Sequence, residues 1–275
     1  MTGSLWRVVG TGFSAFAVLV LIFLVLPTLV IVPLSFSSAT FLSFPPPGWS
    51  LQWYEGFANS LDYRIAILNS IKIGIPAALL ATIFGTLAAL ALVRGNVAGR
   101  RALSALMIAP LILPQIVLAI GLFPIMVKLG IVGSYPAILL GHAVLCLPLV
   151  FITVAASLKS YAPSIELAAM TLGANPWNTF RFVTFPMIRV GVVVGFIFSF
   201  TFSFDELILA IFLTSPATRT VPRLLWEHLN YQMTPVIAAA TVVLLVLTLS
   251  LLVVAALVNR SSASGRVRGA NEGAT

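Results

Sequence analysis

The charged residues of the chain lie in short segments that separate long apolar runs. Asp, Glu, Lys and Arg are absent between Arg7 and Glu55, Lys72 and Arg94, Arg101 and Lys128, Lys128 and Lys159, and Glu227 and Arg260. Each gap can hold the roughly 20 apolar residues that cross a bilayer as a helix, and one more apolar run covers 190–213. The pattern predicts six spans, near 12–34, 72–93, 103–127, 136–157, 190–213 and 236–258.

Composition supports a membrane protein. Of 275 residues, 60% are hydrophobic and only 8% are charged, with a mean hydropathy of +1.11, whereas soluble domains are about 25% charged. Lipid cannot satisfy backbone polar groups, so the spans must be helices. The single cysteine, Cys146, excludes an internal disulfide. His142 and His228 have no second ligand at metal-binding spacing, so no metal site is expected. We predict an all-α membrane protein with one domain over 1–275.

Basic residues orient the spans. One set of loops and termini carries ten Lys or Arg residues and the other carries four, with Lys72 at a boundary. The positive-inside rule places the richer set in the cytoplasm, which leaves both termini cytoplasmic after six spans. The tail 260–275 is small, polar and basic, so we expect it to be disordered. The net charge of +8 therefore reflects topology and requires no nucleic acid.

One cytoplasmic loop, 158–189, is much longer than the other. It reads as a helix, a turn and a second helix: Gly173 can end the first helix in a left-handed conformation, and Pro176 stops its continuation. An interfacial helix lying on the membrane is one interpretation. The small surface of Ala168 and Ala169 favours the other, which is close docking against a protein.

This loop resembles a known family. "LAAMTLGANPWNTFRFVTFP" is similar to the EAA loop of ABC-importer permeases, whose pattern is Glu-Ala-Ala, three residues, Gly, nine residues, an aliphatic, one residue, Leu-Pro. Two positions depart from the pattern: Leu167 stands where the motif has Glu, with Glu166 one residue earlier, and Phe185 replaces Leu. The positions that match are Ala168, Ala169, Gly173, Val183 and Pro186. The segments "APLILPQIVLAIGL" and "SFTFSFDELILAIF" resemble spans of the same permeases, the latter of the spermidine/putrescine subgroup.

The resemblance implies a type I importer permease of the bacterial inner membrane. Its implied partners are a second permease subunit, a cytoplasmic ATPase dimer and an external substrate-binding protein. The chain has no G-x-x-x-x-G-K-[ST] motif, so ATP and Mg would be bound by the ATPase, and this chain would be a transport subunit without enzymatic activity. The loop would couple it to that ATPase through Glu166, Ala168, Ala169, Gly173 and Pro186.

Two adjacent acids interrupt the fifth apolar run. Asp205 lies eight residues before Leu213, and an ionised acid inside a membrane costs about 2.5–3.5 kcal/mol. On a regular helix Ser199, Ser203 and Glu206 share one face, while Thr201 and Asp205 lie on another. Three interpretations stay open: a hydrogen-bonded acid at a subunit seam, a cation site on a water-filled path, and a gate or proton relay. We take Asp205, Glu206 and Ser203 as candidate pathway residues.

The family likeness suggests a small cationic solute such as spermidine or putrescine. Other amines, amino-acid-like solutes, metals and anions are alternatives, because the binding protein sets much of the specificity. Two other classes of protein, an intramembrane enzyme and a stand-alone secondary transporter, fit the sequence less well. An intramembrane enzyme would need a Ser/His, Cys/His or His/acid constellation beside the acids, and the sequence offers none. A stand-alone secondary transporter would leave the long cytoplasmic loop without a purpose.

Overall fold

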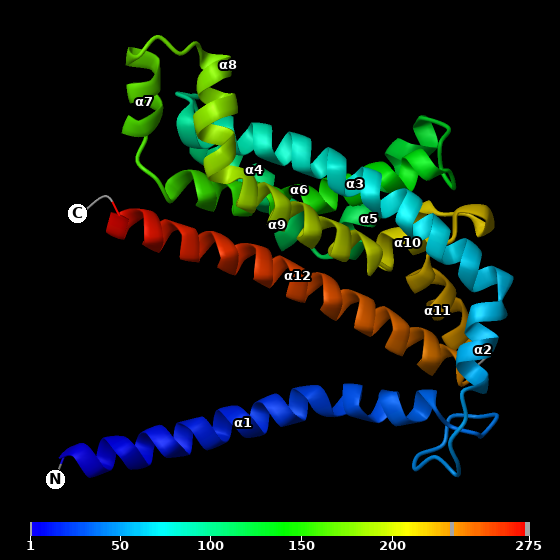
Figure 1. The fold of residues 1–275 in the computed structure, drawn as a ribbon. Helices are drawn as coiled ribbons and strands as arrows, with labels where there is room; N and C mark the ends of the chain where they lie inside the picture. The colour runs from blue at the N-terminus through cyan, green and yellow to red at the C-terminus, as the bar shows by residue number, and fades with distance from the viewer. Residues whose placement is uncertain (1, 232–233, 273–275) are drawn as a thin grey trace. The chain divides into compact units, whose positions relative to one another are not determined.

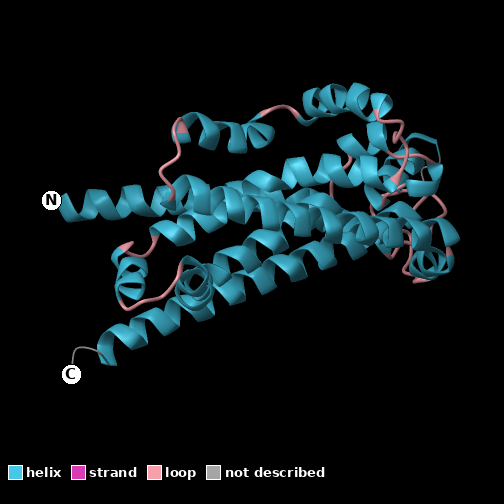
Figure 2. Ribbon diagram, turned by 90° about the horizontal axis from the view of Figure 1, so that it is seen from above, coloured by secondary structure: helices cyan, strands magenta, loops and turns pink. Residues whose placement is uncertain are grey.

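The computed structural model describes residues 2–231 and 234–272, and this part of the chain is built from helices without a β-strand (Figures 1 and 2). The first helices are α1 (Thr2–Ser35), α2 (Gln52–Asn59), α3 (Leu61–Arg94), α4 (Arg100–Ile112), α5 (Gln115–Lys128) and α6 (Tyr135–Lys159). They are followed by α7 (Ser164–Thr171), α8 (Pro176–Thr179), a π-helix η1 (Phe180–Thr184), α9 (Phe185–Phe204) and α10 (Ile208–Leu213). A 3-10 turn η2 (Pro216–Thr218), α11 (Val221–Tyr231) and α12 (Val236–Glu272) complete the described chain.

The predicted spans correspond to these helices. Within the described residues, five helices are long and apolar enough to cross a membrane, and α4 with α5 forms a bent pair that makes six if counted as one span. The second span is longer than predicted, because α3 begins at Leu61 instead of near 72. Its first turns contain Asp62, Arg64 and Lys72, which a count based on charge-free gaps excludes.

The third span is broken. α4 and α5 meet at a 103° bend, and Pro114 stands immediately before α5 with an extended backbone. Proline lacks an N–H and disfavours helix in the residue before it, which accounts for the break. Other prolines lie inside continuous helices, namely Pro27, Pro33, Pro76, Pro110, Pro124 and Pro148.

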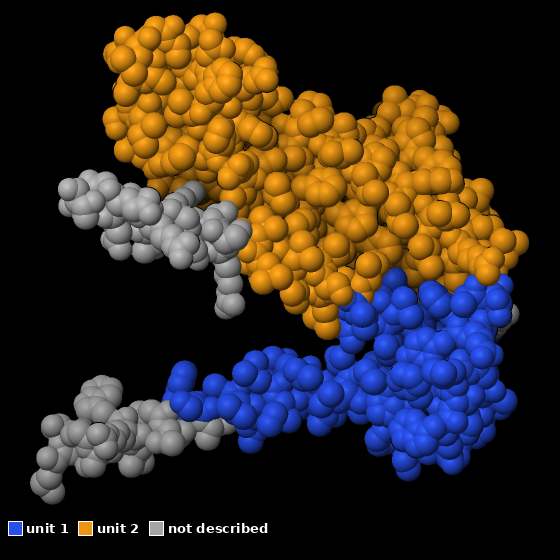
Figure 3. Space-filling view, in the orientation of Figure 1, with its two compact units in different colours: residues 1–60, 227–246 blue, residues 61–226, 247–275 orange. Residues whose placement is uncertain are grey.

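The chain divides into two compact units (Figure 3). The first comprises Met1–Ser60 with Glu227–Val246, and the second comprises Leu61–Trp226 with Leu247–Thr275. In the first unit, Trp53 donates to the carbonyl of Ser37 at 2.7 Å, and the hydroxyls of Ser35 and Tyr54 share a hydrogen bond. These bonds hold α2 against the loop that follows α1.

The core of the second unit is the packing of α3, α6 and α9. Gly191 and Gly195 are buried on α9, and a side chain at Gly191 would meet the carbonyl of Thr153 on α6 at 2.8 Å. Small residues one turn apart permit such close helix approach. Cys146 is 1% exposed in the same core and packs there as a small apolar residue.

A buried amide joins three separate segments of the second unit. Asn69 of α3 donates to the carbonyls of Ala217 and Arg219, both at 3.0 Å, and accepts from the hydroxyl of Tyr135 at 2.7 Å. Asn69 is only 2% exposed. The amide therefore fixes the start of α6 and the η2 turn to α3 with every bond inside the protein, as apolar surroundings require.

The C-terminal helix extends beyond its predicted end. The part of α12 that is apolar enough to cross a membrane is Val236–Val258, as predicted. The helix itself continues to Glu272, into the segment 260–275 that we expected to be disordered. No proline follows Val236 in the sequence, so no residue without a backbone N–H interrupts this helix. Residues 273–275 of the expected tail lie outside the described residues.

Candidate functional site

The fifth span is interrupted at the two acids. α9 ends at Phe204 and α10 begins at Ile208, so the prediction of one regular helix over 190–213 is wrong at 205–207. No proline or glycine lies in this segment. At the break a side chain binds the backbone. The carboxylate of Glu206 accepts from the N–H groups of Leu209 at 2.9 Å and Ala210 at 3.2 Å. Glu206 thus satisfies donors that the start of a helix leaves free.

Glu206 is also the centre of a buried polar cluster. It is 4% exposed, and its Oε2 lies 3.4 Å from Nε2 of His142 on α6. Nδ1 of His142 shares a 2.7 Å hydrogen bond with the hydroxyl of Ser203. A carboxylate buried in apolar surroundings is costly unless it has such partners. The cluster therefore explains how this acid is accommodated inside a membrane helix.

Sequence spacing does not pair His142 with Glu206. It shows only that His142 has no second ligand at metal-binding spacing. The partner comes from α6, 64 residues before Glu206, and no spacing rule within one helix connects them. The only usable signal was that both a histidine and an acid occur in runs otherwise free of charge.

Asp205 has a different environment. It is exposed and lines a cavity of about 540 Å³ together with Gln115, Thr201 and Leu252. Gln115 is the first residue after the break in the third span, so both interrupted spans contribute to this cavity. Irregular backbone at membrane depth is tolerated where it is buried in protein or lines a water-filled cavity.

The three candidate pathway residues therefore lie in different environments. Ser203 is buried against His142, Glu206 borders the cavity but is almost fully buried, and Asp205 is open to it. On a regular helix Thr201 and Asp205 share one face, and in the structure both residues line the cavity.

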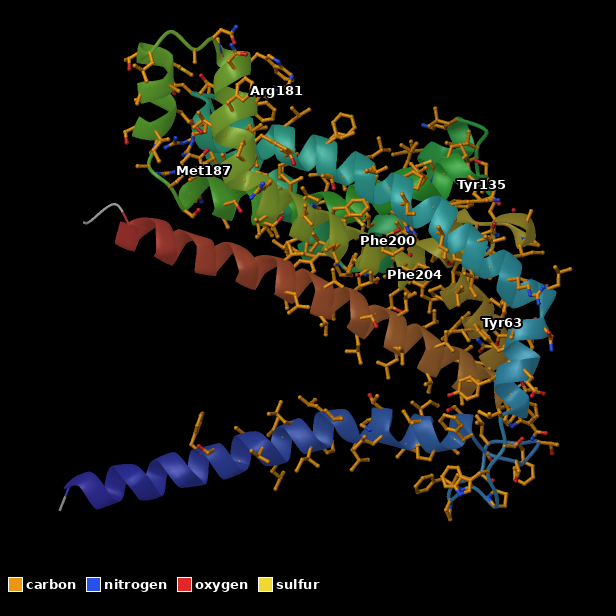
Figure 4. All side chains as sticks on the ribbon, viewed as in Figure 1. Tyr63, Tyr135, Arg181, Met187, Phe200 and Phe204 are labelled. Carbon is orange, nitrogen blue, oxygen red and sulfur yellow. The ribbon has the colours of Figure 1, made fainter. Side chains whose placement is uncertain are left out.

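The phenylalanines of the fifth span also lie in two different places. Phe198 and Phe202 line the cavity, while Phe200 and Phe204 pack together with ring centres 5.7 Å apart near the end of α9 (Figure 4). The phenylalanines at alternating positions of this span therefore do not all face one cavity.

The loop over 158–189 forms the predicted helix, turn and helix. Gly173 follows α7 with a φ of 92°, the left-handed conformation that glycine adopts without strain. Pro176 opens a new helix, α8, and the side chain of Asn175 caps it by accepting from the N–H of Asn178. The helix then continues through η1 into α9; Figure 4 labels Arg181 in η1 and Phe204 at the end of α9.

Glu166 attaches α7 to the rest of the second unit. Its Oε2 lies 3.1 Å from Nε of Arg94 at the end of α3, and its Oε1 accepts from the hydroxyls of Tyr161 and Thr184. Arg94 in turn donates to the carbonyl of Leu158 at 2.7 Å. Burial, together with the hydrogen bond donated to Glu166, raises the pKa of the Tyr161 phenol, so this donor stays protonated at neutral pH.

Most other residues of α7 and of the turn after it are exposed. Leu167, at the motif position of Glu, is 60% exposed and Leu172 is 89% exposed. Ala168, Gly173 and Pro186 are exposed as well, and Ala169 is half-buried. α7 therefore presents an apolar surface whose orientation is fixed from behind by Glu166. Within residues 2–231 and 234–272, no three His, Cys, Asp or Glu side chains are grouped to hold a metal ion.

The chain is similar to proteins of one transport family. Residues 81–263 match the model for binding-protein-dependent transport system inner membrane components. The spermidine/putrescine transport system permease protein PotC of Haemophilus influenzae is 31% identical over 250 residues, which cover 90% of this chain and 96% of that protein. The putrescine transport system permease protein PotI of Escherichia coli is 34% identical over 230 residues, covering 81% and 82%.

Solved structures share the fold. A bacterial ABC transporter that imports the acidic polysaccharide alginate has a chain that superposes with a TM-score of 0.71 at 18% identity, covering 90% of this chain and 95% of that one. The methionine transporter MetNI gives a TM-score of 0.60 at 15% identity, covering 71% and 94%. These likenesses concern the arrangement of helices alone.

Proposed function

The chain belongs to the family of binding-protein-dependent transport system inner membrane components, and on this premise we propose that it forms half of the path by which an ATP-driven importer passes a small cationic solute of the spermidine or putrescine type. It is a multi-pass transport subunit and not itself an enzyme. One observation carries the proposed solute class: the carboxylate of Asp205 is open to a cavity between two interrupted spans.

The chemistry of that cavity suits an alkyl ammonium ion. An ionised acid at membrane depth is costly in the absence of a counter-charge, and a solute ammonium group would offset this cost at Asp205. The rings of Phe198 and Phe202 add an aromatic wall, which can attract a cation through its π-face. The relatives named as spermidine and putrescine permeases support the same solute class. Glu206 shapes the path by holding α10, and because its side chain is almost fully buried it offers the solute little access.

The proposed partners follow from the family. A second permease subunit would complete the path, an external binding protein would deliver the solute, and a cytoplasmic ATPase dimer would bind ATP and Mg. We place the chain in a bacterial inner membrane with both termini in the cytoplasm, as the distribution of Lys and Arg favours. ATP-driven closure of the ATPase would then act on α7 and shift the two permease halves between outward and inward openings.

In this proposal the residues of the coupling loop have two roles. Glu166 positions α7 through Arg94, Tyr161 and Thr184. The exposed surface at Ala168 and Gly173 would enter a groove on the ATPase, where small side chains allow close approach. Ala169 lies half-buried beneath that surface, and Pro186 stands at the start of α9, through which movement of the loop would reach the fifth span.

Asp205→Asn is expected to lower uptake of a labelled polyamine by about tenfold or more, because a hydrogen bond to a charged group contributes about 1.5–3 kcal/mol. Uptake is measured in proteoliposomes that contain the complete importer. Glu55→Gln, which removes an exposed acid from α2, is the matched control and should leave uptake unchanged. Normal polyamine uptake by a correctly assembled Asp205→Asn importer contradicts the proposed role.

Ala168→Arg is expected to reduce copurification of the ATPase by at least about tenfold, because an unpaired charge in a packed interface costs several kcal/mol. Asn96→Arg adds the same charge to the exposed loop between α3 and α4 and should not change the yield of ATPase. The amount of ATPase recovered with the tagged permease is the measurement. Equal recovery with both variants would mean that α7 does not dock there.

A further inference from the structure

A second cavity, of about 670 Å³, lies at the C-terminal end of α3, whereas Asn69 lies near the N-terminal end of that helix. Its lining comes from the ends of α3 and α6 and from the first turns of α4, all within the second unit. The residues that line it are Leu92, Val93, Arg94, Arg100, Arg101, Ser104, Ile108, Phe151, Ala155, Lys159, Tyr161 and Pro163. The proposed function uses none of the cavity's free cations.

The mouth of the cavity is strongly positive. Arg100, Arg101 and Lys159 are exposed there, and none of the lining residues is acidic. Arg94, the fourth cation, is already engaged by Glu166 at 3.1 Å. Within the described part of the chain, no ion pair joins the other three to an acid. Three basic side chains therefore converge on one cavity without a counter-charge.

The lining changes from basic to apolar along two helices. On α4 it passes from Arg100 through Ser104 to Ile108, and on α6 from Lys159 through Ala155 to Phe151. Each series spans eight residues, which is about 12 Å of helix at 1.5 Å per residue. The positions are spaced four apart and so lie on one face of each helix. The cavity thus has a charged mouth and an apolar interior directed along the membrane-crossing helices.

We propose that this cavity binds an anionic phospholipid, with the phosphate at Arg100, Arg101 and Lys159 and one acyl chain against Ile108, Ala155 and Phe151. Basic pockets between membrane helices on the cytoplasmic side suit anionic headgroups. The first turn of α4 begins at the same mouth, and its free N–H groups favour an anion. A free phosphate would use the cations but would leave the apolar walls exposed, so the lipid fits the whole lining. The proposal rests on the proposed membrane orientation and is independent of the transported solute.

The test measures preferential lipid retention by the intact importer. The complex is purified in nanodiscs that contain phosphatidylcholine with a minor fraction of phosphatidylglycerol, and the lipids bound after exchange are counted by native mass spectrometry. The wild-type protein should retain phosphatidylglycerol over phosphatidylcholine. Arg100→Gln with Arg101→Gln should lower this preference by about 25-fold, or about fivefold for each cation removed near an anionic surface.

Matched controls separate the site from general charge. Arg181→Gln with Arg189→Gln removes the same charge from the same proposed side of the membrane but outside the cavity, and should keep the preference. Ser104→Trp fills the cavity without changing charge and should abolish it.

Two results overturn the proposal. One is wild-type retention of phosphatidylglycerol by the Arg100→Gln, Arg101→Gln protein. The other is full displacement of phosphatidylglycerol by excess inorganic phosphate, which would identify the site as one for a free anion. Polyamine uptake is a separate readout, so failure of either proposal can be recognised without the other.

Discussion

Glu206→Ala is expected to lower the free energy of unfolding by about 2–5 kcal/mol, because each buried polar group that is left without a partner costs about 1–3 kcal/mol. The substitution leaves His142 without its carboxylate partner and leaves the N–H groups of Leu209 and Ala210 without acceptors. All three lie in an interior that offers no replacement. Denaturant unfolding of the purified protein in detergent, followed by circular dichroism, measures the loss.

The adjacent acid supplies the control for this experiment. Asp205 is open to the cavity, so Asp205→Asn should change the free energy of unfolding by no more than about 0.5 kcal/mol, as exposed substitutions usually do. The two acids are therefore expected to give opposite phenotypes, a folding defect at Glu206 and a transport defect at Asp205. Equal stability of the Glu206→Ala and wild-type proteins would contradict the structural role given to Glu206.

Gly191→Ala with Gly195→Ala is expected to destabilise the protein by about 1–3 kcal/mol for each site, the usual cost of overpacking. A methyl group at Gly191 would lie 2.8 Å from the carbonyl of Thr153, and one at Gly195 would lie 2.6 Å from the hydroxyl of Thr153 and 3.1 Å from Cα of Val150. Backbone atoms of α6 are involved at both sites, so α6 and α9 must separate to relieve the clash. Thermal unfolding of the purified complex measures the effect.

Gly121→Ala is the matched control for the glycine pair. Gly121 lies inside α5, and nothing approaches within 4 Å of a methyl group placed there. Because alanine is favoured over glycine within a helix by roughly 0.5–1 kcal/mol, this variant should be slightly more stable than the wild type. The two substitutions are thus expected to shift stability in opposite directions. A destabilised Gly121→Ala protein would show that helix propensity and available space do not determine how these substitutions change stability.

The existence of the spans and the loop over 158–189 could be predicted because their signals are local. A charge-free run locates a membrane helix, although α3 begins at Leu61 instead of near 72. Gly173 and Pro176 mark a helix end and a helix start by their own backbone preferences. The spacing of Gly191 and Gly195 is a local signal of the same kind, because small residues one turn apart permit close helix packing. Each of these features depends on neighbours in the sequence, and the structure retains them all.

The interior of the site depends on contacts between distant segments. The break at 205–207 contains no helix-breaking residue, so the sequence gives no sign that the helix ends there. A helical wheel that treats 190–213 as one regular helix therefore misplaces the side chains that follow the break. The pairing of Glu206 with His142, and of Glu166 with Arg94, joins residues that are 64 and 72 positions apart. Charge alone could identify these residues as unusual, but only packing of α3, α6 and α9 brings the partners together.

The distance in sequence between His142 and Glu206 has a consequence for biogenesis. α6 leaves the ribosome and enters the bilayer before α9 and α10 are synthesised, so the imidazole is already at membrane depth when the carboxylate arrives. The insertion machinery meets a fifth segment with two acids, each unfavourable by about 2.5–3.5 kcal/mol at the bilayer centre. We therefore expect this segment to integrate poorly when translated alone, and efficiently when α6 precedes it. Cotranslational order would then serve as a check on assembly, because a chain that loses α6 would release its fifth segment for quality control.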